Sequence, residues 1–210
     1  MLNIETVLVL DPHTDDGVLG CGGTIARLTQ EGKNVYYVTF SLCAASIPAG
    51  LPSNILATEA RRACQVLGIP SRNLEVKDYP VRSFPDHRQE ILDDLIVLRD
   101  TLKPNLVLLP STHDIHQDHQ VLAQEGLRAF KHSTILGYEM PWNNLQFIAP
   151  AIFTLQNEQI EAKIEASLQY KSQEHRNYIG REFITSLARV RGQQANRRFG
   201  EAFQVVRWIV

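Results

Sequence analysis

The chain has 210 residues, of which 44% are hydrophobic, and its formal net charge at pH 7 is -2. This composition is typical of a globular protein that buries a full core, and it excludes a disordered chain and a strongly basic nucleic-acid-binding protein. No apolar run approaches the roughly 20 residues that a membrane-spanning helix needs, so we expect no membrane insertion.

Strand and helix patterns then alternate along the chain. A strand over residues 6–10 precedes a helix that ends near residue 30, and a strand over 35–40 precedes a helix over 57–67. A strand over 74–78, a helix over 87–102, a strand over 106–109 and a helix over 120–131 follow. The chain ends with a strand over 135–139, a long helix containing 159–172 and a strand over 203–210.

This alternation predicts an α/β fold: a Rossmann-like sandwich whose mostly parallel sheet is covered by helices on both faces. Nothing resembles a linker, so we expect one domain over residues 1–210. The N-terminus has no signal-peptide pattern, and the three cysteines, Cys21, Cys43 and Cys64, are an odd number without close-paired spacing. We therefore expect a protein of the reducing cytoplasm without disulfides or a thiolate zinc site.

Two polar clusters follow two of the predicted strands. Residues 11–16 read Asp-Pro-His-Thr-Asp-Asp, and residues 113–119 read His-Asp-Ile-His-Gln-Asp-His. The carboxyl ends of parallel strands lie at one edge of a sheet, where ligands bind in folds of this class. We therefore expect the two clusters to form one site, although helix capping and loop hydrogen bonds explain either cluster equally well by itself.

The residue types in these clusters suit zinc, which accepts imidazole and carboxylate ligands and keeps one position free in catalytic sites. His13, Asp16 and His119 can supply three ligands to Zn²⁺, with another divalent metal as the alternative in the cell. Asp15 can accept a proton from water, whose pKa zinc lowers to roughly 7. We expect Asp118 to act partly as the N-cap of the following helix and to orient a histidine.

Three further residues are candidates for substrate contact. For Arg82 and Asp114, a substrate role and a structural role are equally supported, and Trp142 suits either a sugar-stacking wall or packing against a loop. Few basic residues lie near the two clusters, which disfavours a highly charged phosphate substrate. The glycines at 20, 22 and 23 lack the dinucleotide-binding order, so we expect them to permit close helix packing.

The chain resembles the LmbE-like or PIG-L-like N-acetylglucosaminyl deacetylases over nearly its whole length. The family's His-Pro-Asp-Asp-Glu and His-Pro-Asp-His motifs correspond to residues 13–17, His-Thr-Asp-Asp-Gly, and residues 116–119, His-Gln-Asp-His. The remaining similar segments are Leu19-Gly20-Cys21-Gly22-Gly23-Thr24, Lys163, Tyr170-Lys171-Ser172-Gln173, Arg191-Gly192 and Glu201-Ala202-Phe203. Departures occur at Thr14, Gly17 and Gln117, and Phe199-Gly200-Glu201 lacks a tyrosine that many relatives have.

The resemblance implies the roles of the motif residues. It makes His13, Asp16 and His119 the zinc ligands and Asp15 the general base. His116 would stabilise the tetrahedral intermediate as a cation and protonate the leaving amine, with Asp118 tuning its charge.

The implied activity is zinc-dependent removal of the N-acetyl group from an N-acetylglucosamine-type amino sugar or its conjugate, with release of acetate. Two alternatives stand beside it: a catalytically silent sugar-binding or scaffold protein of the same fold, and a zinc hydrolase of another ester or amide. The expected partner is a small-molecule amino sugar and not a nucleic acid, and a homo-oligomer is one alternative for the assembly.

Overall fold

The computed structural model describes residues 4–48 and 50–209. Residues 1–3, on which part of the expectation about the N-terminus rests, and Val210, at the end of the predicted last strand, lie outside the described residues. The strands are β1 (Thr6–His13), β2 (Asn34–Ser41), β3 (Leu74–Val76), β4 (Leu106–Pro110), β5 (Thr134–Tyr138), β6 (Ala151–Leu155) and β7 (Phe199–Arg207). The α-helices are α1 (Asp16–Gln30), α2 (Ile55–Val66), α3 (Arg88–Leu102), α4 (Gln117–Ala129), α5 (Asn157–Ser167) and α6 (Arg181–Gln194).

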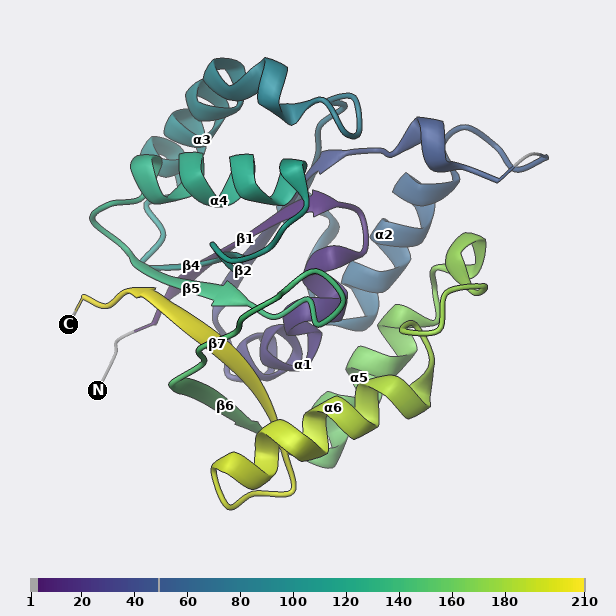
Figure 1. The fold of residues 1–210 in the computed structure, drawn as a ribbon, viewed down its shortest axis with the longest axis vertical. Helices are drawn as coiled ribbons and strands as arrows, with labels where there is room; N and C mark the ends of the chain where they lie inside the picture. The colour runs from purple at the N-terminus through teal and green to yellow at the C-terminus, as the bar shows by residue number, and fades with distance from the viewer. Residues whose placement is uncertain (1–3, 49, 210) are drawn as a thin grey trace.

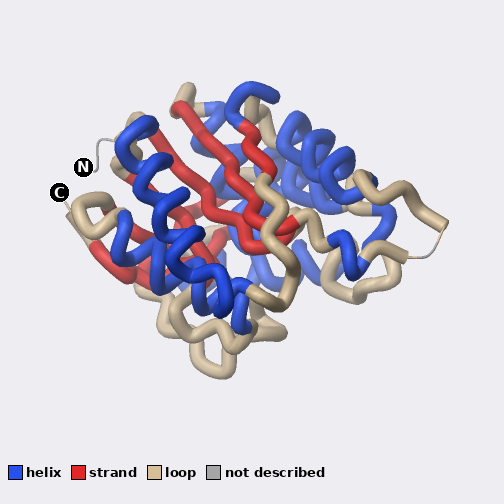
Figure 2. Tube along the Cα trace, turned by 90° about the horizontal axis from the view of Figure 1, so that it is seen from above, coloured by secondary structure: helices blue, strands red, loops and turns tan. Residues whose placement is uncertain are grey.

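The strands form one sheet in the order β3-β2-β1-β4-β5-β7-β6. The first five positions pair in parallel, and β7 runs antiparallel to both of its neighbours. Figure 1 shows α3 and α4 on one face of this sheet and α1, α2 and α5 on the other, and Figure 2 shows the strands between the helical layers. The predicted α/β fold with a mostly parallel, doubly covered sheet is therefore confirmed.

Side chains along β1 point alternately to the two faces of the sheet, which explains why helices cover both faces. Val7 and Val9 belong to the core beneath α1, α2 and α5, whereas Leu8 and Leu10 belong to the core beneath α3 and α4. All four side chains are fully buried. A strand with two apolar faces needs a helical layer on each side.

The end of the chain differs from the prediction. The expected helix over 159–172 ends at Ser167, a second helix, α6, follows it, and the last strand covers 199–207 rather than 203–210. β6 has no counterpart in the sequence analysis, since it is a short edge strand that follows Pro150 and is mostly half-buried. Its register against β7 depends on pairing across more than forty residues, which local patterning does not encode.

Helix α1 contains a break that Glu201 of β7 stabilises. Cys21 has non-helical angles, φ -142° and ψ 22°, and the next turn begins with backbone N–H groups that donate to the Glu201 carboxylate from Gly23 (3.0 Å) and Thr24 (2.6 Å). Lys163 of α5 forms a buried ion pair with the same carboxylate at 2.6 Å. This arrangement fixes α1, whose first residue belongs to the site described below.

Close packing explains the glycines of α1, as expected. A Cβ atom at Gly20 would lie 2.4 Å from the Tyr138 ring, and one at Gly23 would lie 2.6 Å from Leu155. All three cysteines lie in the described part of the chain, and they are buried and free. Within residues 4–48 and 50–209, no helix has both the length and the apolar character needed to cross a membrane.

Candidate metal and catalytic site

The two polar clusters meet because β1 and β4 are parallel neighbours. β1 pairs with β4 from Val7 against Leu106 to Val9 against Leu108, so both strands run toward the same sheet edge. β1 ends at His13, and α1 begins at Asp16. Helix α4 begins at Gln117, three residues earlier than predicted, so the second motif occupies a helix start rather than a loop.

Three donor atoms from the two clusters converge at the base of the site. Asp16 Oδ2 lies 3.0 Å from His13 Nδ1 and 3.0 Å from His119 Nε2, and the two nitrogens are 3.2 Å apart. His116 also contributes, since nitrogen atoms of His13, His116 and His119 all lie within 4.8 Å of one another. Imidazole nitrogens and a carboxylate oxygen gathered this closely fit a zinc-type metal ion.

Two buried carboxylates hold the histidines by their far nitrogens. Asp118 Oδ2 bonds to His13 Nε2 at 3.0 Å, and Asp114 Oδ2 bonds to His119 Nδ1 at 2.7 Å. Each bond leaves the opposite ring nitrogen directed at Asp16, which is how metal-binding histidines are usually oriented. Asp118 therefore orients a histidine, as expected.

The structure corrects two assignments for these carboxylates. Asp118 does not cap α4, because the N-cap is His116. Its carboxylate bonds to His13, and its charge opposes the lowering of the His116 pKa. Asp114 does not line the cavity: it is 1% exposed, and its second oxygen accepts the backbone N–H of His116 at 2.8 Å. These bonds place Asp114 behind the His119 ring and the start of α4, outside the lining of the cavity.

The charges in this cluster are strongly coupled. Burial lowers the pKa of His13 and of His119, but the Asp16 carboxylate and the hydrogen bonds that the rings donate to Asp118 and Asp114 raise these pKa values to about 9 and about 10. Burial raises the pKa of Asp16, yet the two imidazoles hold it well below its usual value. The surroundings of the Asp16 carboxylate therefore favour positive charge, which a divalent cation can supply in place of protons.

His116 differs from the other two histidines. Its Nδ1 accepts the backbone N–H of Asp118 at 3.2 Å, so in the neutral ring the proton is on Nε2. Burial, followed by the charges of His119 and His13, lowers its pKa. Both features favour the neutral ring of His116, with Nε2–H as a hydrogen-bond donor.

Asp15 lies beside the ligand cluster, at the N-cap of α1, and it makes no capping hydrogen bond there. Burial and the neighbouring Asp16 raise the pKa of Asp15 to about 6, against the opposing charge of Arg176. A carboxylate with a pKa near neutrality suits proton transfer to and from a substrate.

The departure at Gly17 has a packing explanation. A Cβ atom at this position would lie 2.6 Å from the Tyr37 hydroxyl, so the tyrosine ring fills the space that a side chain at 17 would need. The Gly17 N–H donates to Asp11 Oδ1 at 2.6 Å, which fixes the turn between β1 and α1.

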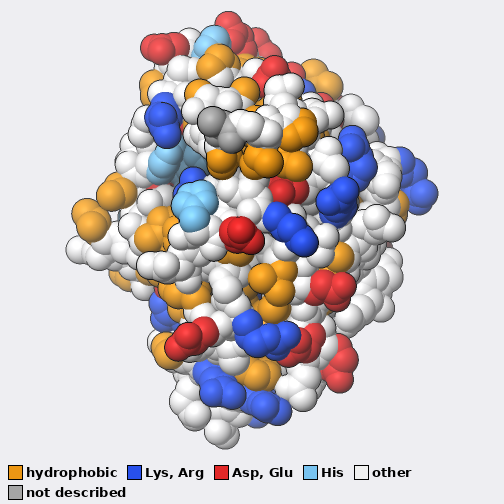
Figure 3. Space-filling view, turned by 90° about the vertical axis from the view of Figure 1, so that its right-hand side faces the viewer, with side chains coloured by type: hydrophobic (Ala, Val, Ile, Leu, Met, Phe, Trp, Pro, Cys, Tyr) orange, Lys and Arg blue, Asp and Glu red, His pale blue; other side chains and the backbone are white. Residues whose placement is uncertain are grey.

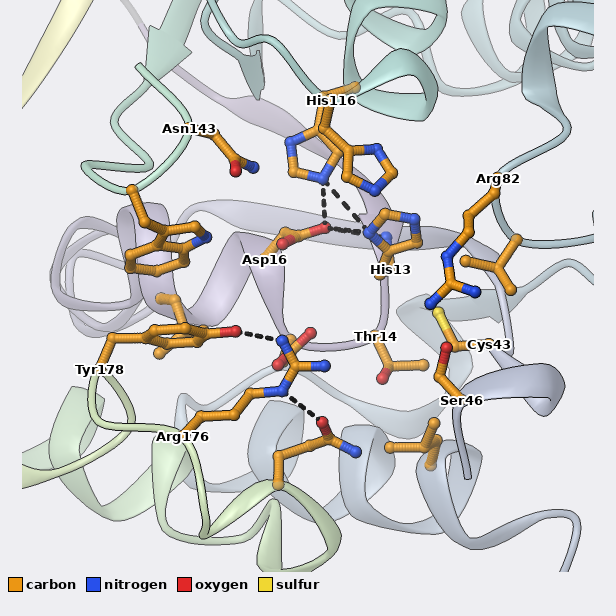
Figure 4. Close-up of a pocket in the computed structure, with 17 residues that line it drawn as sticks. His13, Thr14, Asp16, Cys43, Ser46, Arg82, His116, Asn143, Arg176 and Tyr178 are labelled. Atoms are coloured by element: carbon orange, nitrogen blue, oxygen red, sulfur yellow. Dashed lines mark hydrogen bonds and ion pairs between the residues drawn. The ribbon is translucent and has the colours of Figure 1, made fainter. Parts of the chain in front are cut away.

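A cavity of about 230 Å³ opens above the cluster (Figure 4). Pockets that enclose drug-sized ligands usually have roughly 300–1,000 Å³, so this one suits a small group such as one sugar ring. Its lining residues are His13, Thr14, Asp15, Asp16, Leu19, Cys43, Ser46, Leu56, Val81, Arg82, His116, His119, Trp142, Asn143, Gln173, Arg176 and Tyr178.

The cavity contains two of the three predicted substrate residues, Arg82 and Trp142. Trp142 stacks on Tyr178, with ring centroids 3.8 Å apart and planes 12° from parallel, so its ring packs on the protein and also borders the cavity. Sequence reasoning missed Gln173, Arg176 and Tyr178. The Tyr-Lys-Ser-Gln segment at 170–173 was the available signal, but only the fold brings it to the site.

The chain is similar in sequence and in fold to known proteins. Diacetylchitobiose deacetylase of Thermococcus kodakarensis is 22% identical over 97% of this chain and 84% of its own length. The structure of N,N'-diacetylchitobiose deacetylase from Pyrococcus horikoshii is similar with a TM-score of 0.82, at 22% identity over 97% of this chain and 84% of that chain. A 4-carboxy-2-hydroxymuconate hydratase of Pseudomonas putida KT2440 has a TM-score of 0.79, at 21% identity over 99% of this chain and 98% of that chain. The shared fold therefore hosts more than one chemistry.

The family model agrees with the motifs of the site. It is the PIG-L model, described as GlcNAc-PI de-N-acetylase, and it matches residues 8–130, which contain both polar clusters and more than half of the chain. The protein belongs to the PIG-L family of de-N-acetylases.

Proposed function

We propose that the protein is a metal-dependent deacetylase that removes the N-acetyl group from an N-acetylglucosamine-type amino sugar or its conjugate and releases acetate. Membership of the PIG-L family and the name of the Thermococcus relative support the reaction type. The observation that carries the proposal is the convergence of His13, Asp16 and His119 within about 3 Å at the floor of a sugar-sized cavity. We treat residues 1–210 as one domain with this activity.

Zinc is the metal that this donor set favours, with another divalent ion as the alternative. We assign the ligands to His13 Nδ1, Asp16 Oδ2 and His119 Nε2, because these atoms face one another and the carboxylates behind the rings hold them there. His116 is the competing ligand among the histidines. We place it outside the ligand set because its Nδ1 is engaged by the backbone and its Nε2 carries the proton.

A bound divalent ion supplies Lewis acidity toward the acetyl carbonyl and toward the attacking water. Asp15 then accepts the proton of that water as the carbon–oxygen bond forms. The same carboxyl group delivers the proton to the nitrogen as the carbon–nitrogen bond breaks, so acetate and the free amine leave. This division assigns both proton transfers to Asp15 and removes the need for a cationic His116.

His116 acts as a hydrogen-bond donor in this scheme. Its Nε2–H would stabilise the negative charge that develops on the carbonyl oxygen, and the backbone N–H of Asp118 keeps that tautomer in place. A fixed donor of this kind needs no reorganisation during the reaction, which is why such donors contribute strongly to catalysis.

The experiment is an assay of acetate release from N-acetylglucosamine and its glycosides, with and without zinc, using wild type and Asp15→Asn. We expect release that requires the metal and is lost in the variant, although the variant retains the metal. Stoichiometric metal binding without acetate release from any substrate would refute the proposed reaction and favour another amide or ester, or a silent sugar-binding protein. Absence of metal binding would refute the site itself.

A further inference from the structure

Two arginines line the cavity away from its catalytic floor. Arg82 comes from the loop between β3 and α3, and Arg176 comes from the segment between α5 and α6. Figure 4 shows both guanidinium groups directed into the cavity from different sides. On the face shown in Figure 3, in contrast, basic and acidic side chains are interspersed. The two arginines of the cavity thus differ from the mixed charges on that face.

The catalytic centre itself holds Arg82 in place. Its backbone N–H donates to Asp118 Oδ2 at 2.6 Å, and the same oxygen bonds to His13 Nε2. Its φ angle is +68°, a backbone conformation that residues other than glycine seldom adopt. Such conformations are found disproportionately at functional sites. Among residues 4–48 and 50–209, no hydrogen bond or ion pair joins the Arg82 guanidinium to another side chain.

Arg176 is also fixed, by neutral partners. Its Nε donates to Gln173 Oε1 at 2.7 Å, and its Nη1 donates to the hydroxyl of Tyr178. Tyr178 is in turn stacked on Trp142. These contacts orient the guanidinium, whose charge also interacts with Asp15 and Asp16. Part of its donor fork stays free for a ligand.

Among the described residues, the cavity lining offers the two arginines no carboxylate apart from those of the catalytic floor. Of the side chains that line the cavity in the described part of the chain, Asp15 and Asp16 are the carboxylates, and both belong to the catalytic floor. The remaining lining residues beside the arginines are apolar or neutral, as at Leu56, Val81 and Asn143. Few basic residues lie near the motifs in sequence, but the fold brings these two distant arginines to the cavity.

We propose that the substrate carries an acidic group, a carboxylate or a phosphate, which Arg82 and Arg176 bind while the acetamide lies at the His13–Asp16–His119 cluster. This inference rests on the proposed function and names the substrate class for it. Guanidinium groups form charge-assisted, often bidentate hydrogen bonds with both kinds of anion. A neutral N-acetylglucosamine would leave Arg82 without a counter-charge, and Arg176 would have only the carboxylates of the catalytic floor.

The test compares acetate release by the metal-loaded protein from matched substrates. N-acetylglucosamine and its methyl glycoside are the neutral ones, N-acetylglucosamine 1-phosphate and 6-phosphate carry phosphate, and N-acetylmuramic acid carries a carboxylate. We expect kcat/KM to be at least about tenfold higher for one acidic class, since a hydrogen bond to a charged group corresponds to roughly 10- to 100-fold in binding. The preferred class distinguishes phosphate from carboxylate.

The variants are Arg82→Gln and Arg176→Gln, and Arg189→Gln is the matched control, since Arg189 is exposed on α6 and does not line this cavity. Each cavity variant should lower the ratio of kcat/KM for acidic over neutral substrate by roughly tenfold or more. The control should keep the wild-type ratio, and added salt should reduce the preference. Equal rates for neutral and acidic substrates, or a ratio that the cavity variants do not change, would overturn the inference while leaving the deacetylase intact. The second of these outcomes would mean that Arg176 only influences Asp15.

A binding measurement keeps the inference testable if no acetate is released. Calorimetry would compare glucosamine 6-phosphate, glucosamine 1-phosphate and muramic acid with glucosamine on the metal-loaded wild type and on both cavity variants. Tighter binding of an acidic sugar that depends on the arginines would support the anion site although the proposed reaction fails. Binding without any preference for acidic sugars would refute the anion site.

Discussion

The Asp118 carboxylate joins the metal-binding histidine to the cavity wall, so Asp118→Asn tests the arrangement of the site. Its Oδ2 bonds to His13 Nε2 at 3.0 Å and accepts the Arg82 N–H at 2.6 Å, while Oδ1 accepts the Phe84 N–H at 3.2 Å. The carboxylate is fully buried. An asparagine has nearly the same shape but has only one acceptor oxygen, so it cannot reproduce these three contacts.

The magnitude follows from the lost acceptor. If the amide oxygen of the asparagine faces the Arg82 N–H, its amide nitrogen faces the Phe84 N–H, and neither of these two nitrogens can accept. In the reverse orientation the amide nitrogen faces the Arg82 N–H instead. Either way at least one buried donor lacks an acceptor, which costs about 1–3 kcal/mol of stability. Loss of the carboxylate behind a metal-binding imidazole should also weaken metal binding by roughly 10- to 100-fold.

Chelator competition at constant pH measures the metal affinity, and urea unfolding of the metal-free protein measures stability. Asp86→Asn is the matched control, because Asp86 is an exposed carboxylate in the segment between β3 and α3 that makes no side-chain contact with the cluster. We expect both quantities to fall in Asp118→Asn and neither to change in the control. Wild-type metal affinity in Asp118→Asn, whatever its stability, would refute the claim that this carboxylate orients a ligand.

The remaining variants test the catalytic assignments and two packing features. Asp15→Asn should lower acetate release by roughly 100- to 10,000-fold and His116→Ala by about 100- to 1,000-fold. Elemental analysis should show that both variants keep their metal. Gly20→Ala should destabilise the protein by about 1–3 kcal/mol in urea unfolding, because the new methyl group would overlap a tyrosine ring of β5. Lys163→Met should cost about 3–5 kcal/mol in the same assay, since it leaves the Glu201 carboxylate buried without its cation.

Controls separate these effects from general damage. Loss of metal from His116→Ala would make His116 a ligand and would contradict its role as a donor. Gly180→Ala adds a methyl group with no atom within 4 Å at the N-cap of α6, so it should cost less stability than Gly20→Ala. Adding Glu201→Gln to Lys163→Met should recover part of the lost stability, and an additive double variant would contradict the proposed coupling.

Local patterns in the sequence determined the layers of the fold and the floor of the site. Runs such as Val7 to Leu10 and Leu106 to Leu109 require a sheet buried on both faces, and helical periods between them require crossovers. Two polar clusters at the ends of such strands must then meet at one edge. His13, Asp16 and His119 were identifiable for this reason, because their proximity follows from strand direction alone.

The tertiary structure decided which group each side chain contacts. The partner of Asp118 is His13 across more than a hundred residues, and the pairing of Lys163 with Glu201 spans two elements at the far end of the chain. Arg176 reaches the cavity through the turn after α5, where no periodicity predicts a direction. Hydrogen bonds depend on positions accurate to a fraction of an ångström, and those positions arise from the packing of the whole core rather than from neighbouring residues. The charge of the cavity, and with it the acidic substrate that we propose, therefore became visible only in the folded chain.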